Sequence, residues 1–157
     1  MKKMLMLVLL MISSHAFAKE TIGCVDTNFH LTFDDKVCVD AFHDPDIQGV
    51  VCHVSYAKKG GISGELGFAE NPSRFSIACR QNGPIIFKKH IPEKETDIFQ
   101  ERASFIFKTF SATRFWDQKN NTIVYLMISR KVIHGSPMNS ISTVPLQSWN
   151  NIQPKIQ

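Results

Sequence analysis

The sequence of 157 residues lacks most of the patterns that point directly to a molecular function. It has no C-x-x-C pair, no H-E-x-x-H motif and no G-x-x-x-x-G-K-[ST] loop, which excludes zinc-finger, metalloprotease and P-loop signatures. No stretch keeps apolar residues at helical spacing over 12 residues, which argues against a helical bundle. After residue 18, the longest apolar run is the six residues Ile123 to Ile128, too short to span a bilayer as a helix.

The sequence also lacks a strong charge of either sign. Eighteen lysines and arginines oppose 14 acidic residues, for a net charge of +4. Two of these lysines and none of the acids lie in the first 18 residues, so the remaining chain carries a net charge of +2. A chain this close to neutral gives no electrostatic basis for binding nucleic acid or an anionic membrane. We therefore expect neither partner.

Residues 1–18 have the three parts of a secretory signal peptide. Met1 to Lys3 is positively charged, Met4 to Ile12 is a nine-residue apolar run, and Ala16-Phe17-Ala18 is an A-x-A cleavage motif. An uncleaved anchor and a lipoprotein anchor at Cys24 are the alternatives. We predict cleavage after Ala18 and export to the periplasm, with no membrane span in the mature protein.

The rest of the chain is dominated by short, β-branched runs separated by turn residues. The predicted strands are Ile22–Leu31, Lys36–Phe42, Val50–Tyr56, Phe75–Arg80, Ile85–Lys89, Phe105–Trp116, Thr122–Ile133 and Ser140–Leu146. The predicted turns and loops between them are Asp44-Pro45-Asp46, Asn82-Gly83-Pro84, His90 to Asp97 and Asp117 to Asn121. This pattern predicts a mainly β, single-domain antiparallel β-sandwich or barrel-like fold with little helix, covering residues 19–146. Residues 147–157 are expected to form a flexible C-terminal tail.

Four cysteines in an exported protein favour disulfides over a metal site. Cys52 and Cys79 lie in strand-like runs on either side of a glycine-rich loop, and we predict a bridge between them. Cys24 and Cys38 are the remaining pair. A tight turn at Asp34-Asp35 would put them out of register, so either the connection is wider or they are not bonded. Cys38 opposite Cys52 is a further alternative, across the turn after Asp44.

The most distinctive segment is Lys58 to Gly67, which holds half of the eight glycines. Clustered glycines let backbone amides approach an anion, and the two lysines add positive charge. The candidate residues for binding a ligand or partner are Lys58, Lys59, Gly60, Gly61, Ser63, Gly64, Gly67 and Arg80. The structural alternative is a surface loop whose glycines supply positive φ angles.

Other polar residues allow weaker functional interpretations. His43, Asp44 and Asp46 come nearest to a metal-binding pattern, but a metal needs three or four converging ligands, so we expect the aspartates to shape a turn. We predict no metal and no cofactor. An arginine in or beside a strand, such as Arg114, has three candidate roles. Its stem packs on apolar surface, or its guanidinium pairs with a carboxylate or binds an anion.

Three groups of segments resemble the CreA family of small secreted bacterial proteins. They are Ala41–Asp46 with Val51–Ser55; Gly60–Glu70 with Ser76–Ile85; and Arg114–Asp117 with Tyr125-Leu126, Ser129, Gly135–Ser142 and Val144-Pro145. The resemblance covers nearly all of the chain after the signal peptide. It implies an exported protein and places family cysteines on Cys52 and Cys79, whereas Cys24 and Cys38 depart from the family pattern. It implies no activity, substrate or cofactor, and carries over no catalytic residue.

These observations favour a non-enzymatic binding or accessory module of the cell envelope. Its partner would be an envelope ligand or protein whose identity the sequence does not specify. The alternative is an envelope hydrolase with a dispersed Ser/His/Asp site, which requires a histidine within about 3 Å of a serine or carboxylate.

Overall fold

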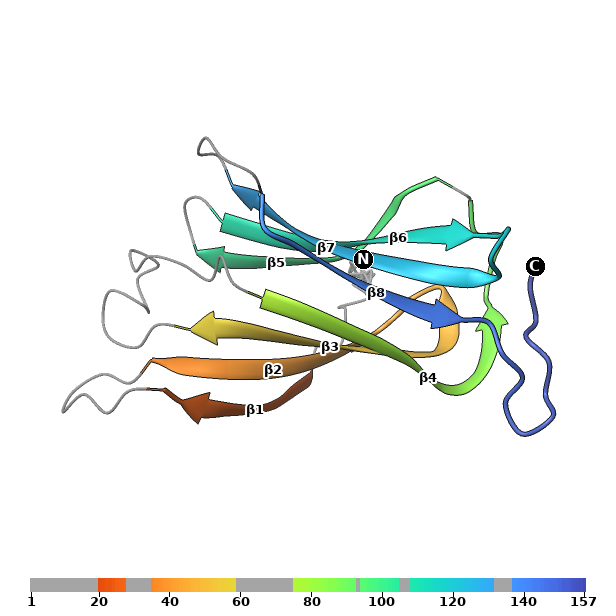
Figure 1. The fold of residues 1–157 in the computed structure, drawn as a ribbon, viewed down its shortest axis with the longest axis horizontal. Helices are drawn as coiled ribbons and strands as arrows, with labels where there is room; N and C mark the ends of the chain where they lie inside the picture. The colour runs from red at the N-terminus through yellow and green to blue at the C-terminus, as the bar shows by residue number, and fades with distance from the viewer. Residues whose placement is uncertain (1–19, 28–34, 59–74, 93, 105–107, 132–136) are drawn as a thin grey trace, which may run out of the picture.

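The computed structural model describes residues 20–27, 35–58, 75–92, 94–104, 108–131 and 137–157. One sheet contains, in order, β1 (Glu20–Asp26), β2 (Lys36–His43), β3 (Ile47–Lys58) and β4 (Phe75–Phe87). The other contains β5 (Thr96–Ser104), β6 (Lys108–Asp117), β7 (Thr122–Lys131) and β8 (Asn139–Pro145). Every neighbouring pair is antiparallel, and the described residues include no helix. The two sheets lie one above the other, which confirms the predicted sandwich and excludes a closed barrel (Figure 1).

The hydrophobic core fills the space between the two sheets, because successive side chains of a strand point to opposite faces. Its most deeply buried aliphatic and aromatic side chains are Phe42, Ile47, Val50, Val54, Ile85, Phe87, Ile91, Ile123, Tyr125, Met127 and Val144. On β7 the inward Ile123 and Met127 are fully buried, whereas the outward Leu126 and Ile128 are only half-buried. The lack of alternation from Ile123 to Ile128 predicts a strand buried on both faces. The structure corrects this, because the second sheet covers only the inner face and the outer face is partly exposed.

β4 corrects the prediction of two strands separated by a turn at Asn82-Gly83-Pro84. The strand runs through these residues, and the four positions between Gln81 and Ile86 lie opposite Gly49 alone. Gly49 has φ +83°, and a Cβ on it would collide with the carbonyl oxygen of Pro84. The turn-forming residues therefore make a bulge in a continuous strand, where the extra backbone approaches a glycine.

β5 is a strand that the sequence did not predict. Thr96 and Asp97, assigned to the end of a loop, pair with Arg114 and Thr113 of β6. The segment has no regular alternation of apolar and polar residues, and as an edge strand it takes its conformation from the neighbour with which it pairs.

Both cysteine pairs are bonded, each between residues that face each other directly on neighbouring strands. Cys52–Cys79 joins β3 to β4 as predicted, and Cys24–Cys38 joins β1 to β2. Of the two alternatives for Cys24 and Cys38, the structure shows the wider connection, because the pairing of β1 with β2 ends with Asp26 opposite Lys36. The wider connection brings Cys24 and Cys38 into register.

The alternative pairing of Cys38 with Cys52 is contradicted by the register of β2 and β3. The turn at Asp44-Pro45-Asp46 does join these strands, but Cys52 faces Phe42 and Cys38 faces Tyr56. The two cysteines are therefore four positions out of register.

The two sheets meet along one side, where β8 lies beside the outer edge of β4. The backbone amides of Ile77 and Cys79 donate to the hydroxyls of Ser140 and Ser142 at 3.3 and 2.8 Å, respectively. β4 is the last strand of its sheet, so its outward-facing amides have no neighbouring strand to bond with. The serine hydroxyls of β8 accept the hydrogen bonds of these amides instead. This seam brings the sheets together without a continuous backbone ladder.

The segment after Gln147 also contacts β4. Lys155 donates its amide to the carbonyl of Ile85 and accepts from the amide of Phe87, both at 2.9 Å. These bonds place part of the expected tail along β4 (Figure 1). No helix in the described ranges is both long and apolar enough to cross a membrane.

Candidate functional site

The turn between β2 and β3 is organised by the buried side chain of Asp44. Its Oδ1 accepts hydrogen bonds from the backbone amides of Asp46 and Ile47, at 2.9 and 3.1 Å. An aspartate that binds the amides just after it stabilises a turn, which is the role predicted for this residue. The same carboxylate is held from the opposite sheet.

Arg114 of β6 and Tyr125 of β7 reach across the sandwich to this turn. The Arg114 guanidinium donates through Nη1 to Asp44 Oδ1 at 2.5 Å and through Nη2 to Asp46 Oδ2 at 3.0 Å. The Tyr125 hydroxyl donates to Asp44 Oδ2 at 2.8 Å. Of the roles considered for Arg114, the structure therefore shows pairing with carboxylates. We call Asp44, Asp46, Arg114 and Tyr125 the cross-sheet cluster.

Burial and neighbouring charges shift the pKa values of Tyr125, Arg114 and Asp46 in the cross-sheet cluster. Burial and the adjacent Asp44 carboxylate raise the pKa of the Tyr125 hydroxyl far above its ordinary value, so it stays protonated. Burial acts to lower the pKa of Arg114, but Asp44 and Asp46 outweigh it and raise that pKa. Burial acts to raise the pKa of Asp46, but hydrogen bonds from Lys89 and Arg114 outweigh it and lower that pKa. Tyr125, Arg114 and Asp46 therefore keep their protonation states near neutral pH and hold the two sheets together.

The structure does not bring His43, Asp44 and Asp46 together around an ion. His43 is exposed, and its Nδ1 lies 3.3 Å from the carbonyl oxygen of Val50. Both Asp44 oxygens already accept hydrogen bonds from the protein. Within the described ranges, no three His, Cys, Asp or Glu side chains are grouped to hold a metal. The described contact of His43 is with backbone, whereas the hydrolase alternative needs a serine or carboxylate beside a histidine.

The predicted glycine-rich site lies mostly outside the described residues, which include only Lys58 and Arg80 of its candidates. Those outside are Lys59, Gly60, Gly61, Ser63, Gly64 and Gly67. Arg80 on β4 faces Val51, seven positions before Lys58 on β3. At about 3.3 Å per residue, Lys58 and Arg80 are separated by roughly 23 Å along the sheet. The described part of the fold does not bring the two basic residues together.

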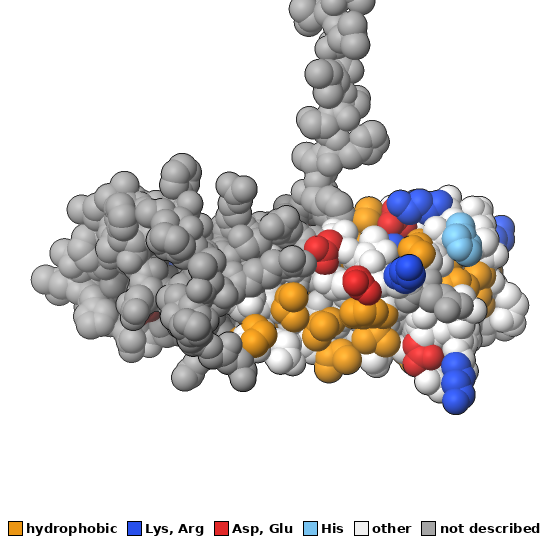
Figure 2. Space-filling model, turned by 90° about the horizontal axis from the view of Figure 1, so that it is seen from above, with side chains coloured by type: hydrophobic (Ala, Val, Ile, Leu, Met, Phe, Trp, Pro, Cys, Tyr) orange, Lys and Arg blue, Asp and Glu red, His pale blue; other side chains and the backbone are white. Residues whose placement is uncertain are grey.

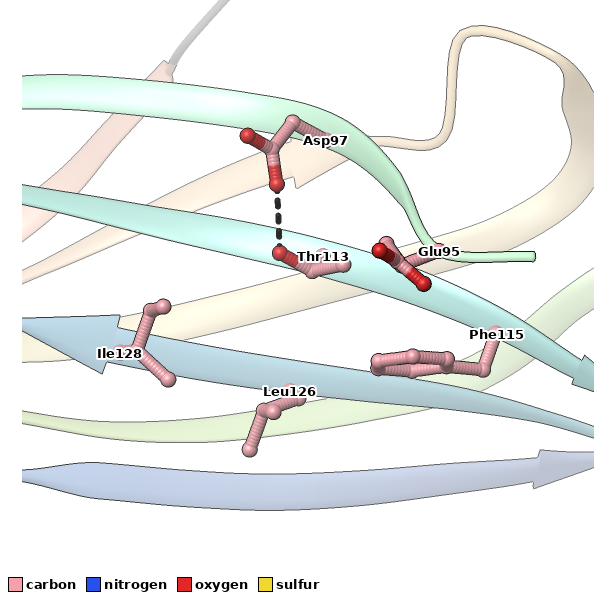
Figure 3. Close-up of a pocket in the computed structure, with 6 residues that line it drawn as sticks. All are labelled: Glu95, Asp97, Thr113, Phe115, Leu126 and Ile128. Atoms are coloured by element: carbon pink, nitrogen blue, oxygen red, sulfur yellow. Dashed lines mark hydrogen bonds between the residues drawn. The ribbon is translucent and has the colours of Figure 1, made fainter.

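A second candidate site, missed by the sequence interpretation, is an open hollow on the outer face of β5, β6 and β7. Its volume is about 440 Å³, and we call it the outer hollow (Figure 3). Its lining residues are Glu95, Asp97, Thr113, Phe115, Leu126 and Ile128. The Thr113 hydroxyl donates to Asp97 Oδ1 at 2.6 Å, which orients that carboxylate.

The alternation of β6 and β7 explains why these side chains share one face. Thr113 and Phe115 are separated by the inward-facing Arg114, and Leu126 and Ile128 by the inward-facing Met127. Ile141 of β8 pairs with Leu126 and is 63% exposed. Figure 2 shows hydrophobic side chains gathered on this face, with acidic and basic side chains beside them. The outer hollow therefore combines an accessible apolar floor with two carboxylates.

Together, these features define a disulfide-linked antiparallel β-sandwich with a buried ionic cluster inside and an open hollow outside. The family model described as CreA protein matches residues 22–149. The chain is 45% identical over 149 residues to Protein CreA of Escherichia coli strain K12 and to that of Escherichia coli O157:H7. Each match covers 92% of this chain and 94% of the relative. The chain therefore belongs to the CreA family. No solved structure matches it.

Proposed function

We propose that this protein is an exported, non-enzymatic binding module of the bacterial cell envelope, with the outer hollow as its binding surface. The observation that carries the proposal is the outer hollow, because apolar surface and carboxylates lie together there within reach of a partner. The strongly interacting groups of the cross-sheet cluster, by contrast, are engaged with one another in the interior.

Export is supported by residues 1–18 and by the cysteines. The basic start, the apolar run and the A-x-A motif match a cleavable signal peptide. Two disulfides among the described residues suit an oxidising compartment such as the periplasm. We expect protein recovered from a periplasmic extract to begin at Lys19 when its intact mass is measured. A mass that retains residues 1–18 would contradict cleavage after Ala18.

Binding at the outer hollow would use two kinds of contact. Phe115, Leu126 and Ile128 would bury apolar surface, which contributes about 25 cal/mol for each Å² removed from water. Glu95 and Asp97 would orient polar or charged groups at the edge of this floor. Neither contact forms or breaks a covalent bond, so the proposed role is recognition.

A panel of envelope components tests the binding function. Purified protein with isotope-labelled methyl groups is titrated with sugars, inorganic phosphate, peptidoglycan fragments and short peptides from envelope proteins. We expect at least one class to raise the melting temperature and to shift the methyl signals of Leu126 and Ile128. Ile22 on β1 of the other sheet is an exposed internal control whose signal should not move. If no component shifts the Leu126 and Ile128 signals, the proposed binding surface is wrong.

A further inference from the structure

We infer that the outer hollow binds an extended protein segment that carries a lysine or arginine flanked by apolar side chains. This inference rests on the proposed binding function and adds the chemistry of the partner. It follows from the charge, the apolar floor and the shape of this surface.

The charge of the outer hollow favours a cation. Two of its six lining residues, Glu95 and Asp97, are acidic, and none is basic. The side chains of Glu95 and Asp97 are both exposed to solvent. The hydrogen bond from the Thr113 hydroxyl holds the Asp97 carboxylate in a defined orientation. Figure 3 shows the two carboxylates along the same side of the hollow, with Glu95 above Phe115 and Asp97 above Thr113. A positively charged group placed there meets two carboxylates of the opposite sign.

The apolar floor requires more than a simple cation. Phe115, Leu126 and Ile128 are half-buried in this structure. A bare ion bound in the hollow would leave the exposed part of these side chains in water. A purely apolar ligand would cover the floor but would also remove water from the exposed Glu95 carboxylate without supplying an opposite charge, which is costly. A cation with apolar flanks satisfies both parts of the surface.

The shape favours a protein segment over a small molecule. Small-ligand sites usually enclose most of the ligand, whereas this hollow is open on a sheet face. The apolar surface also continues past the hollow to Ile141 on β8, which pairs with Leu126. An extended segment presents alternate side chains to one side and can cover the hollow and this extension together.

The test uses peptides of defined pattern as probes. The mature protein is titrated with a blocked octapeptide of alternating lysine and leucine, and with matched glutamine–leucine and lysine–serine octapeptides. Affinity is measured by calorimetry, and the site is located from the methyl signals of Leu126 and Ile128. We expect the lysine–leucine peptide to bind most tightly, to shift both signals, and to weaken as salt screens the carboxylates.

Matched variants separate the site from general attraction to a basic peptide. Glu95→Gln with Asp97→Asn removes two negative charges from the outer hollow and keeps an oxygen that can accept from Thr113. Glu20→Gln with Asp26→Asn removes the same charge from β1 in the other sheet. We expect the first pair to weaken lysine–leucine binding about three- to tenfold, and the second pair to leave it unchanged, because exposed ion pairs contribute modestly.

Several results would overturn the inference. Equal affinity for the glutamine–leucine peptide would remove the preference for a cation, and unmoved Leu126 and Ile128 signals would place binding elsewhere. Signals that move with protein concentration alone would assign the hollow to a second copy of the chain. If no peptide shifts the Leu126 and Ile128 signals but a sugar or another small envelope component does, this inference is wrong and the proposed binding function stands. If nothing moves them, both fail.

Discussion

Arg114 and Asp44 lie 70 positions apart in the sequence and form an ion pair in which both side chains are almost completely buried, with exposures of 1% and 0%. Removing two charges from water is costly, so such a pair persists only when further hydrogen bonds complete it. Here Asp46, Tyr125 and two backbone amides supply further hydrogen bonds, and among the described residues only the buried Nε of Arg114 in this pair has no partner. The pair therefore fixes the turn of one sheet against two strands of the other.

Replacing Asp44 with alanine should strongly destabilise the fold, because Arg114 would lose its most buried partner and the turn would lose its acceptor. We expect the free energy of unfolding in urea to fall by about 3–5 kcal/mol. Asp26→Ala is the matched control, since Asp26 and Lys36 form an exposed ion pair at 3.2 Å. Its expected cost is about 0–1 kcal/mol. Similar losses for the two variants would show that the buried pair has no special role.

The lowered pKa of Asp46 predicts how its contribution to stability depends on pH. The folded protein binds a proton at Asp46 more weakly than the unfolded chain, whose ordinary value is near 3.8. Its contribution is therefore fully present above that value and is lost as the pH falls through the lower folded pKa.

We expect the difference in unfolding free energy between wild type and Asp46→Asn to be constant from pH 5 to 7 and to shrink below about pH 4. Urea unfolding at each pH measures this difference. A difference that stays the same at pH 3 would show that the Asp46 carboxylate is not stabilised by Lys89 and Arg114.

Gly49→Ala should disrupt the bulge between β3 and β4. The positive φ of Gly49 and the nearby Pro84 carbonyl both oppose a side chain there. We expect a loss of more than about 1 kcal/mol in thermal or urea unfolding. Gly23→Ala is the control, because an added Cβ there meets nothing within 4 Å. Equal effects at the two glycines would contradict the described bulge.

The two disulfides should have different effects on stability. Cys52–Cys79 closes the longer loop, with a separation of 27 residues against 14, and Cys52 lies in the core. The chain-entropy estimate is about 3.5 kcal/mol for the longer loop and about 3 kcal/mol for the shorter. Replacing Cys52 and Cys79 with alanine adds a loss of packing to this term, chiefly at the fully buried Cys52.

Cys24–Cys38, in contrast, ties down an edge strand whose residues are all exposed. Without it, we expect faster amide hydrogen exchange in β1 and unchanged protection in β3 and β4, because β1 can open locally. The double alanine variant at Cys52 and Cys79 should instead lower protection throughout both sheets. Global loss of protection from the Cys24–Cys38 variant would contradict a local role for that bridge.

Features set by neighbouring residues could be predicted from the sequence. The loop predicted from Asp117 to Asn121 joins β6 to β7, and its amide and side-chain bonds from Asn120 to Asp117 are three residues apart. The role of Asp44 in its turn is equally local. Alternating strand residues and turn residues therefore sufficed to predict an antiparallel sandwich or barrel-like fold, and the structure shows the sandwich.

Features set by distant partners could not be predicted in this way. Asn82-Gly83-Pro84 has the composition of a turn, and only its pairing opposite Gly49 makes it a bulge. Arg114 could pair with a carboxylate, but no local pattern selects Asp44. The run containing Leu126 and Ile128 predicted a strand buried on both faces, which is wrong for the outer face, where both side chains are only half-buried. It did not show that the outer face stays accessible, because that depends on what the rest of the chain covers.

The order of the strands has a consequence for the lifetime of the folded protein. Each sheet is built from strands consecutive in the chain, so its pairs can form between near neighbours, whereas the contact of Arg114 with Asp44 requires both sheets to be in place. Interactions that form after the folding barrier slow unfolding without speeding folding. We expect the buried cluster to govern how long a folded molecule persists, and the hairpins to govern how quickly it forms.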